Sequence, residues 1–302
     1  MINPVAQDAA QFLAPQRRAK RVLAALLRDP IALVGLALTL LLLILAIFGP
    51  WIAPYPLQGA GHTNVVPGGG TALLPPSSEH WFGTDRLGRD LLSRVIMGAR
   101  PALTVSLMVV LLAVLLGAPL GAIAGYRGGW LDEALMRLTD LFLAFPPLLL
   151  AMAIVAALGP GLEHAALALA ISWWPWYARI ARAAAISLRE RYFVDAARSI
   201  GVPDWKVVAR HILPNTLTPL LVQATVDIGT VVLAAGSLAF IGLGAVPPAP
   251  DWGLMVSEGR TFVLDQWWYA AFPGMAIFLS VLGFNLVGDA LRDIFDPRGV
   301  AR

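Results

Sequence analysis

Apolar residues dominate this chain and gather into long runs that carry few or no charges. Each run holds about 20 residues, the length at which an α-helix crosses the hydrocarbon core of a bilayer. We therefore predict an all-α integral membrane protein with about six transmembrane helices. The predicted spans cover residues 31–52, 101–125, 134–158, 164–184, 216–243 and 270–290.

A polar stretch, "YFVDAARSIGVPDWKVVARHILPN" at 192–215, interrupts the apolar pattern between the fourth and fifth predicted spans. Its apolar residues recur at helical spacing, which predicts two short amphipathic helices. Gly201 suits the left-handed position after the first helix, Pro203 the first position of the second, and Pro214 its end. The predicted apolar faces consist of Phe193, Ala196, Ala197 and Ile200, then Trp205, Val208, Ala209 and Ile212.

The segment between the first two predicted spans changes character along its length. It begins as turn-rich coil in "VVPGGGTALLPPSS", and helical spacing follows. Asp85 suits a helix N-cap there, and Leu87, Leu91 and Val95 recur every four residues. We predict a helix lying on the membrane surface. Asp85 and Asp90, near His80, are interpreted as caps and surface polar groups.

Composition and charge place the chain in the membrane class and orient it. The 302 residues are 58% hydrophobic and 14% charged, whereas soluble domains are about 25% charged. The absence of cysteine excludes disulfides and thiolate metal sites. With a cytoplasmic N-terminus, 17 of the 22 Lys and Arg residues lie in or beside inside segments. The positive-inside rule therefore predicts that both termini and the 192–215 stretch are cytoplasmic.

These assignments predict a linear organisation around one membrane domain. The first apolar run is too long for a signal-peptide core and lacks a cleavage pattern after it, so we expect it to be retained. We expect a cytoplasmic N-terminal segment (1–30), a first transmembrane helix (31–52), an extracytoplasmic loop with an interfacial helix (53–100), a transmembrane core (101–290) containing a cytoplasmic loop (190–215), and a cytoplasmic tail (291–302).

Catalytic and metal-binding signatures are missing from the sequence. A phosphate-binding P-loop needs a lysine after glycine, but Lys20 follows Ala19 and Lys206 follows Trp205. The four histidines are scattered, and no Ser, His and acid combination forms a nucleophile motif. We predict a chain that is not an enzyme and holds no cofactor. Energy for any transport must come from other subunits, or transport must be passive.

Two acidic residues inside predicted spans are the first candidates for a transport pathway, because charge is costly in lipid. Asp140 lies one turn from Arg137, so a structural ion pair explains it better than a pathway role. Asp227, with Thr225 and Thr230 nearby, is the better pathway candidate. A role in helix packing explains Asp227 about equally well.

The polar hairpin has two interpretations that its pattern alone does not separate. Its helices could rest on anionic lipid through their arginines. Alternatively, they could form a docking element for a cytoplasmic partner.

A resemblance favours docking. Asp195, Ala196, Ala197 and Gly201, followed by Leu213 and Pro214, resemble the EAA loop of permease subunits in binding-protein-dependent ABC importers. Asp195 stands where that family usually has Glu, and His211 stands at a commonly apolar position. The blocks "HWFGTDRLGRDLLSRVIMGAR", "GAIAGYRGGWLDEALMRLTDLFLAFPPLLLA", "PPAPDWG" and "GDALRDIFDPR" are similar to the C-type permease of dipeptide and oligopeptide importers.

The resemblance implies a type I ABC importer permease in the bacterial inner membrane. It implies a second permease, two ATPase subunits that bind ATP and Mg, and an extracytoplasmic peptide-binding protein as partners, with membrane lipid but no nucleic acid. The loop would then dock on the ATPase. The residues implied in coupling are Phe193, Asp195, Ala196, Ala197, Gly201, Trp205, Leu213 and Pro214.

Two other functions compete with this one. A self-sufficient secondary transporter or channel would leave the hairpin lying on the membrane, but the chain lacks the symmetric interrupted helices typical of that class. A membrane scaffold without transport would not account for resemblance along every block.

Overall fold

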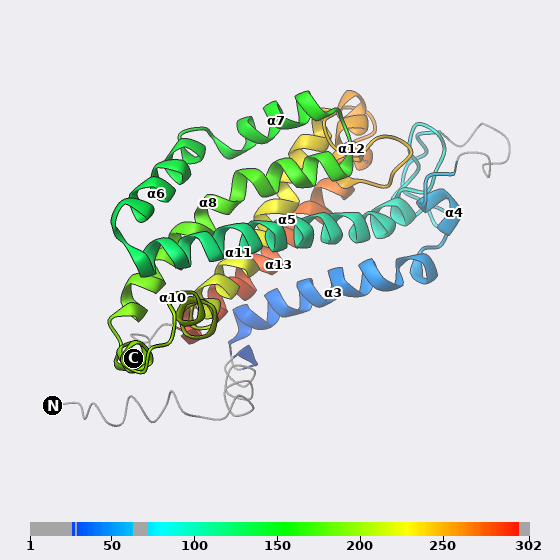
Figure 1. Cartoon of the computed structure of the whole chain (residues 1–302). Coiled ribbons are helices and arrows are strands. Elements are labelled where there is room, and N and C mark those ends of the chain that lie inside the picture. Colours follow the sequence, from blue (N-terminus) through cyan, green and yellow to red (C-terminus); the bar gives the residue numbers. More distant parts are fainter. Residues whose placement is uncertain (1–25, 28, 63–71, 296–302) are drawn as a thin grey trace.

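The computed structural model describes residues 26–27, 29–62 and 72–295. All regular elements in these ranges are helical (Figure 1). An isolated bridge joins Thr84 and Asp90. The elements are α3 (Pro30–Ile52), α4 (Pro56–Gly59), α5 (Leu91–Arg127), α6 (Gly129–Leu143), α7 (Pro147–Leu158), α8 (Leu162–Arg189), α9 (Tyr192–Ser199), α10 (Asp204–Val207), the π-helical turn η1 (Val208–Ile212), α11 (Leu213–Phe240), α12 (Trp252–Gly259), the 3-10 turn η2 (Arg260–Phe262) and α13 (Trp268–Phe295).

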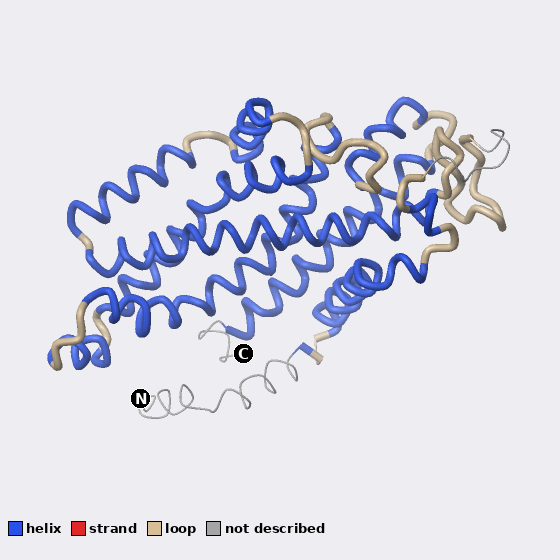
Figure 2. Tube along the Cα trace, turned by 45° about the vertical axis from the view of Figure 1, so that its right-hand side comes forward, coloured by secondary structure: helices blue, strands red, loops and turns tan. Residues whose placement is uncertain are grey.

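The long helices run side by side, and the two ends of the bundle differ (Figures 1 and 2). One end carries the loops together with α4 and α12. The other end carries the hairpin formed by α9, α10 and η1. We call this element the coupling hairpin (residues 192–212). Helix α5 runs the full length between these two ends, and α13 packs against both α3 and α11.

Within the described ranges, four continuous helices are long and apolar enough to cross a membrane. They are α3, α5, the continuous helix Asp204–Phe240 and α13, and the bent pair of α6 and α7 makes a fifth if it counts as one span. Helix α8 is not among them, and it carries the charged residues Glu163, Arg179 and Arg182. The structure therefore shows a helical membrane protein with four or five candidate spans. A total of six spans stays a prediction.

The predicted continuous span at 134–158 is wrong. Helix α6 ends at Leu143, α7 begins at Pro147, and the two are bent by 83°. Pro146 and Pro147 explain the break: each lacks a backbone N–H, and each disfavours helical geometry in the residue before it.

The predicted surface helix at the start of α5 is also wrong. Asp90, not Asp85, caps the helix by accepting from Ser93 N at 2.8 Å. From Leu91 the helix continues through Pro101 to Arg127 without a break. Leu91 and Val95 are buried in the bundle core. The repeat of apolar residues thus belongs to an extension of the second span, not to a separate helix on the membrane surface.

Helix α5 packs on α8 through a row of glycines. Gly117, Gly121 and Gly125 lie one turn apart on α5. A Cβ at each would overlap a backbone carbonyl of α8, those of Trp174, Ala178 and Arg182 respectively. Small residues at four-residue spacing let two membrane helices approach until their backbones touch. This glycine row therefore sets the separation of the two helices.

Candidate functional site

The turn of the coupling hairpin has the predicted geometry. Gly201 has φ +80°, the left-handed region in which side-chain-bearing residues are strained. Gly201 N donates to Arg198 O at 2.9 Å, and Val202 N donates to Ala197 O at 3.1 Å, which ends α9. The prediction that Gly201 occupies the position after the first helix is confirmed.

Gly201→Val is expected to loosen the coupling hairpin. Within the described structure nothing lies within 4 Å of a Cβ at this position, so the backbone conformation is the main cost. That cost is about 1–2 kcal/mol, and it should accelerate hydrogen exchange of the amides of α9 and α10 about 5- to 30-fold. Gly242→Val is the matched control. Gly242 has φ +87° and a similarly open Cβ position at the opposite end of α11, so exchange in the hairpin should not change. Equal exchange in wild type and Gly201→Val would contradict the expectation.

The predicted apolar face of α9 is wrong. Val194 and Ala197 are the buried residues of this helix, whereas Phe193, Ala196 and Ile200 are exposed. Val194 and Ala197 pack toward the bundle, while the larger Tyr192 and Phe193 face out. Asp195 is also exposed, and its backbone carbonyl accepts from Ser199 Oγ at 2.9 Å.

The second half of the hairpin does not end at Pro214. Pro203 is the N-cap of α10 rather than its first residue, and the helix then continues through η1 into α11. Pro214 sits in the first turn of α11, where the wider π-turn accommodates a residue that cannot donate. Leu213 is half-buried and Pro214 exposed. The hairpin is therefore continuous with a candidate span.

The π-turn also displaces the predicted second apolar face. It holds one residue more per turn than an α-helix, so residues before and after it no longer share a face at helical spacing. Trp205 is 67% exposed although Ile212, seven residues later, is fully buried.

Four large apolar side chains are exposed on the coupling hairpin, and we call them the hairpin tip. They are Tyr192, Phe193, Ile200 and Trp205, with exposed fractions of 93%, 43%, 81% and 67%. On its inner side the hairpin is well packed, because Val194, Ala197, Val207 and Ile212 form one core with Tyr126 of α5 and Ala185 of α8. The hairpin is thus fixed to the bundle, while an apolar surface remains open.

The two acids of the predicted spans have different surroundings. Asp140 Oδ1 accepts from Arg179 Nη2 of α8 at 2.5 Å. Arg137 pairs with Glu133 instead, so the predicted Arg137–Asp140 pair is wrong, although Asp140 is in an ion pair. Glu133 precedes Arg137 by four residues, and an acid N-terminal to a base at this spacing is the favourable order on a helix, whereas Asp140 follows Arg137.

Asp227 is buried, with 7% of its surface exposed. Its Oδ1 accepts from Gln223 Nε2 at 3.0 Å. Its carboxylate interacts with the buried hydroxyl of Tyr177 on α8, and neither Oδ2 nor this hydroxyl has another hydrogen-bond partner among the described residues. Thr225 and Thr230 donate to carbonyls one turn back, at Leu221 and Val226, so the structure does not gather them around Asp227. Gln223 was missed in the sequence, although its spacing of four from Asp227 is a signal that could have identified it.

A groove of about 480 Å³ opens between the hairpin-side ends of α11 and α13. Gln223 and Val226 line it from α11, and Asp289 and Arg292 from α13. The groove carries both signs of charge. In the part of the chain that the structure describes, no group of three His, Asp or Glu residues could hold a metal ion.

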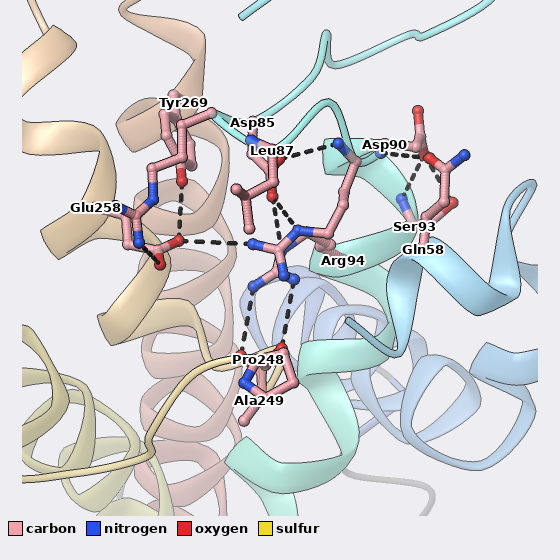
Figure 3. Close-up of polar contacts among 12 residues, drawn as sticks. Gln58, Asp85, Leu87, Asp90, Ser93, Arg94, Pro248, Ala249, Glu258 and Tyr269 are labelled. Carbon is pink, nitrogen blue, oxygen red and sulfur yellow. Dashed lines mark hydrogen bonds and ion pairs between the residues drawn. The ribbon is translucent and has the colours of Figure 1, made fainter. Parts of the chain in front are cut away.

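The opposite end of the bundle holds charged residues that are almost fully buried (Figure 3). We call Asp85, Arg89, Arg94 and Glu258 the buried ion cluster. Asp85 Oδ2 lies 2.6 Å from Arg89 Nε and 3.5 Å from Arg94 Nε. Arg94 also donates to the carbonyls of Pro248 and Ala249, and Glu258 accepts from Tyr269 Oη at 2.8 Å. The cluster joins the loop before α5 to the loop before α12.

A second set of polar contacts lies beside this cluster. Asp90 Oδ1 lies 2.9 Å from His80 Nδ1, and Gln58 Oε1 accepts from Asp90 N at 2.8 Å. The interpretation of Asp85 and Asp90 as surface groups is therefore wrong, because both are at most 1% exposed. Nearby, burial raises the pKa of Asp251, which caps α12, while the hydrogen bond from Leu254 N opposes that shift.

The chain matches two families of transport proteins. Residues 117–299 match the binding-protein-dependent transport system inner membrane component. This range includes the coupling hairpin and most of the described bundle. The chain belongs to this permease family. Residues 18–76 of the permease also match the N-terminal TM domain of oligopeptide transport permease C.

Relatives of the permease cover nearly its whole length. It is 44% identical over 270 residues to a probable D,D-dipeptide transport system permease protein of Escherichia coli K12, covering 89% of this chain and 88% of that relative. It is 43% identical to the dipeptide transport system permease protein of Alkalihalophilus pseudofirmus, covering 98% and 94%. A glutathione transport system permease protein of Escherichia coli O157:H7 is also 43% identical, covering 90% and 88%.

Among solved structures, the permease resembles an inward-facing form of the MetNI methionine ABC transporter. The TM-score is 0.53 at 19% identity, covering 67% of this chain and 96% of that one, which shows a shared fold alone. Together these findings confirm the resemblance found in the sequence. The permease is a non-catalytic, multi-pass component of an inner-membrane ABC importer.

Proposed function

We propose that this permease forms part of the translocation pore of an ATP-driven importer for the peptide class, and that its coupling hairpin transmits ATPase movement to the pore. The observation that carries the proposal is the hairpin tip. It exposes Ile200 and Trp205 on an element that is otherwise packed into the bundle. Exposed apolar side chains of this size favour burial against a protein partner.

The connections of the hairpin support a mechanical role. Two residues separate α8 from α9, and α10 continues through η1 into α11. A displacement of the hairpin therefore acts on both long helices at once. The exposed Asp195 and Ala196 would supply the close contact surface implied by the EAA loop, while Ala197 packs into the core beneath them and Leu213 and Pro214 lie at the entry to α11.

For the membrane topology, we propose six spans with both termini in the cytoplasm. Helix α8 would be the sixth span, because it packs along α5 through the glycine row. An even number of spans places both termini on one side, and the distribution of Lys and Arg makes that side cytoplasmic. The extracytoplasmic loop of 53–100 then contains Asp85, Arg89 and Arg94 of the buried ion cluster, and the proposed core of 101–290 contains Glu258 and the hairpin.

The partners follow from the family and its relatives. We propose a second permease, two ATPase subunits that bind ATP and Mg, and an extracytoplasmic binding protein. The relatives named for dipeptides, D,D-dipeptides and glutathione support a peptide-class substrate. For the pathway we propose Asp227 with Gln223, beside the charged groove of α11 and α13. Thr225 and Thr230 are weaker candidates, and Asp140 has a structural partner in Arg179.

Affinity purification of the tagged permease from its native membranes tests the proposal. Wild type should retain two ATPases and a second permease. Asp195→Ala with Gly201→Val, and separately Ile200→Ser with Trp205→Ser, should retain the second permease and lose the ATPases about tenfold or more, because a few buried contacts dominate such interfaces.

Leu264→Ser is the matched control. Leu264 is 94% exposed at the opposite end of the bundle, so its replacement should leave ATPase recovery unchanged. A wild-type chain that is purified without ATPases and still moves substrate would refute the proposal and favour a self-sufficient secondary transporter.

A further inference from the structure

Tyr126, next to the last residue of α5, contacts both helices of the coupling hairpin. Its side chain is buried, with 3% of its surface exposed. Its Oη donates to Asp204 Oδ1 of α10 at 2.9 Å and accepts from Arg198 Nε of α9 at 3.1 Å. The Arg198 guanidinium also lies 4.8 Å from the centre of the Tyr126 ring. One hydroxyl therefore joins three helices.

These contacts are of a strong kind. Both hydrogen bonds have a charged partner, and such bonds are shorter and about twice as strong as neutral ones. The hydrogen bond to Tyr126 raises the pKa of Arg198, which shows that the contact favours the charged guanidinium. The neighbouring Arg127–Asp204 pair is separated by 4.0 Å between mostly exposed groups, so it contributes little.

Helix α5 needs such a link because the chain does not connect it to the hairpin. Helices α8 and α11 flank the hairpin in sequence and must follow it. Helix α5 can follow only through contacts. It packs on α8 along the glycine row and through the side chains of a shared core, and it meets the hairpin directly through Ala122 and Tyr126.

We infer that Tyr126 is a positioning residue that fastens α5 to the coupling hairpin, so that hairpin movement displaces α5 together with α8 and α11. The inference rests on the proposed coupling function. Helix α5 has 37 residues and is about 55 Å long at 1.5 Å per residue. Its other end carries Arg94 of the buried ion cluster. A hairpin held by Tyr126 thus moves the loops at the far end of the bundle through one continuous helix.

The test uses the purified complex of permeases and ATPases reconstituted in vesicles with the binding protein and a dipeptide. Two quantities are measured: ATPase retention, and dipeptide transported per ATP hydrolysed. Tyr126→Phe keeps the ring and its packing but removes the hydroxyl. We expect ATPase retention to stay unchanged and transport per ATP to fall about three- to tenfold, the size expected for losing an ordinary hydrogen bond, because the charged partners Arg198 and Asp204 are both exposed to solvent.

Asp204→Asn provides an independent variant, since it weakens the same contact from the other side. If both residues act through one hydrogen bond, the double variant should be no worse than the more affected single variant. Tyr55→Phe is the control. Its hydroxyl donates to Glu79 O at the opposite end of the bundle, so transport per ATP should not change.

Unchanged transport per ATP in both Tyr126→Phe and Asp204→Asn would overturn the inference while leaving the coupling function intact. Additive losses in the double variant would also overturn it, because they would show that the two residues act separately. Failure of the coupling function itself gives a different result: the wild-type permease would not retain ATPases at all.

Discussion

Gly121→Ala is expected to destabilise the permease severely, although it adds a single methyl group. The new Cβ would overlap the backbone carbonyl of Ala178, and no rotamer change can relieve a clash between backbones. Helices α5 and α8 would have to separate along the whole glycine row. Overpacking of this kind costs about 1–3 kcal/mol and occasionally more. Thermal unfolding in detergent, followed by the fluorescence of the tryptophans, should show a clearly lower midpoint and a lower yield of folded protein.

Gly274→Ala is the matched control for this prediction. Gly274 lies within α13, and nothing in the described structure comes within 4 Å of a Cβ there. Because alanine favours the helix over glycine by up to about 1 kcal/mol, this variant should be as stable as wild type or slightly more stable. A drop of equal size in both variants would show that the close approach at Gly121 does not decide the outcome.

Asp85→Asn is expected to unfold the end of the bundle that lies opposite the coupling hairpin. Asp85 is fully buried and lies against Arg89 and Arg94, and both guanidiniums are 1% exposed. The substitution keeps the shape but removes the charge, so Glu258 alone faces two buried cations. Breaking a buried ion pair by removing one partner costs about 3–5 kcal/mol. Limited proteolysis should show rapid cleavage near residues 72–90, and the unfolding midpoint should fall.

Two further variants separate charge from other effects of this change. Asp265→Asn removes an exposed carboxylate at the same end, so stability should stay near wild type. Asp85→Asn combined with Arg94→Gln removes one charge of each sign, so it should recover part of the loss. A double variant less stable than Asp85→Asn would indicate that the contacts of Arg94 with Pro248 and Ala249 matter more than charge balance.

The sequence predicted where the helices lie better than which of their faces are buried. Long apolar runs identified the helices, and the polar pattern at 192–215 identified a hairpin whose turn is at Gly201. The orientation of its side chains was not predicted correctly, because the π-turn interrupts the second helix and because packing against α5 and α8, not spacing, decides which face of α9 is buried. Neither the π-turn after Val207 nor the outward orientation of Phe193 follows from local spacing.

Two kinds of contact differ in how far the sequence could have revealed them. The glycine row has a local signature, since Gly117, Gly121 and Gly125 recur every four residues within an apolar helix. The link between Tyr126, Arg198 and Asp204 has none, because it joins residues 72 and 78 positions apart. The buried ion cluster is similar, since Asp85 and Glu258 meet only when the bundle forms.

The π-turn at the end of the coupling hairpin relates the number of residues to the rotation between the hairpin and α11. One residue of an α-helix corresponds to about 100° of rotation about its axis. The additional residue of the turn Val208–Ile212 therefore offsets the direction of Trp205 from that of Asp227 by about this angle. Closing the π-turn to an α-turn would remove the offset without unwinding either flank. The direction in which Trp205 of the hairpin tip faces relative to α11 is thus set by the number of residues in the turn, independently of which side chains occupy it.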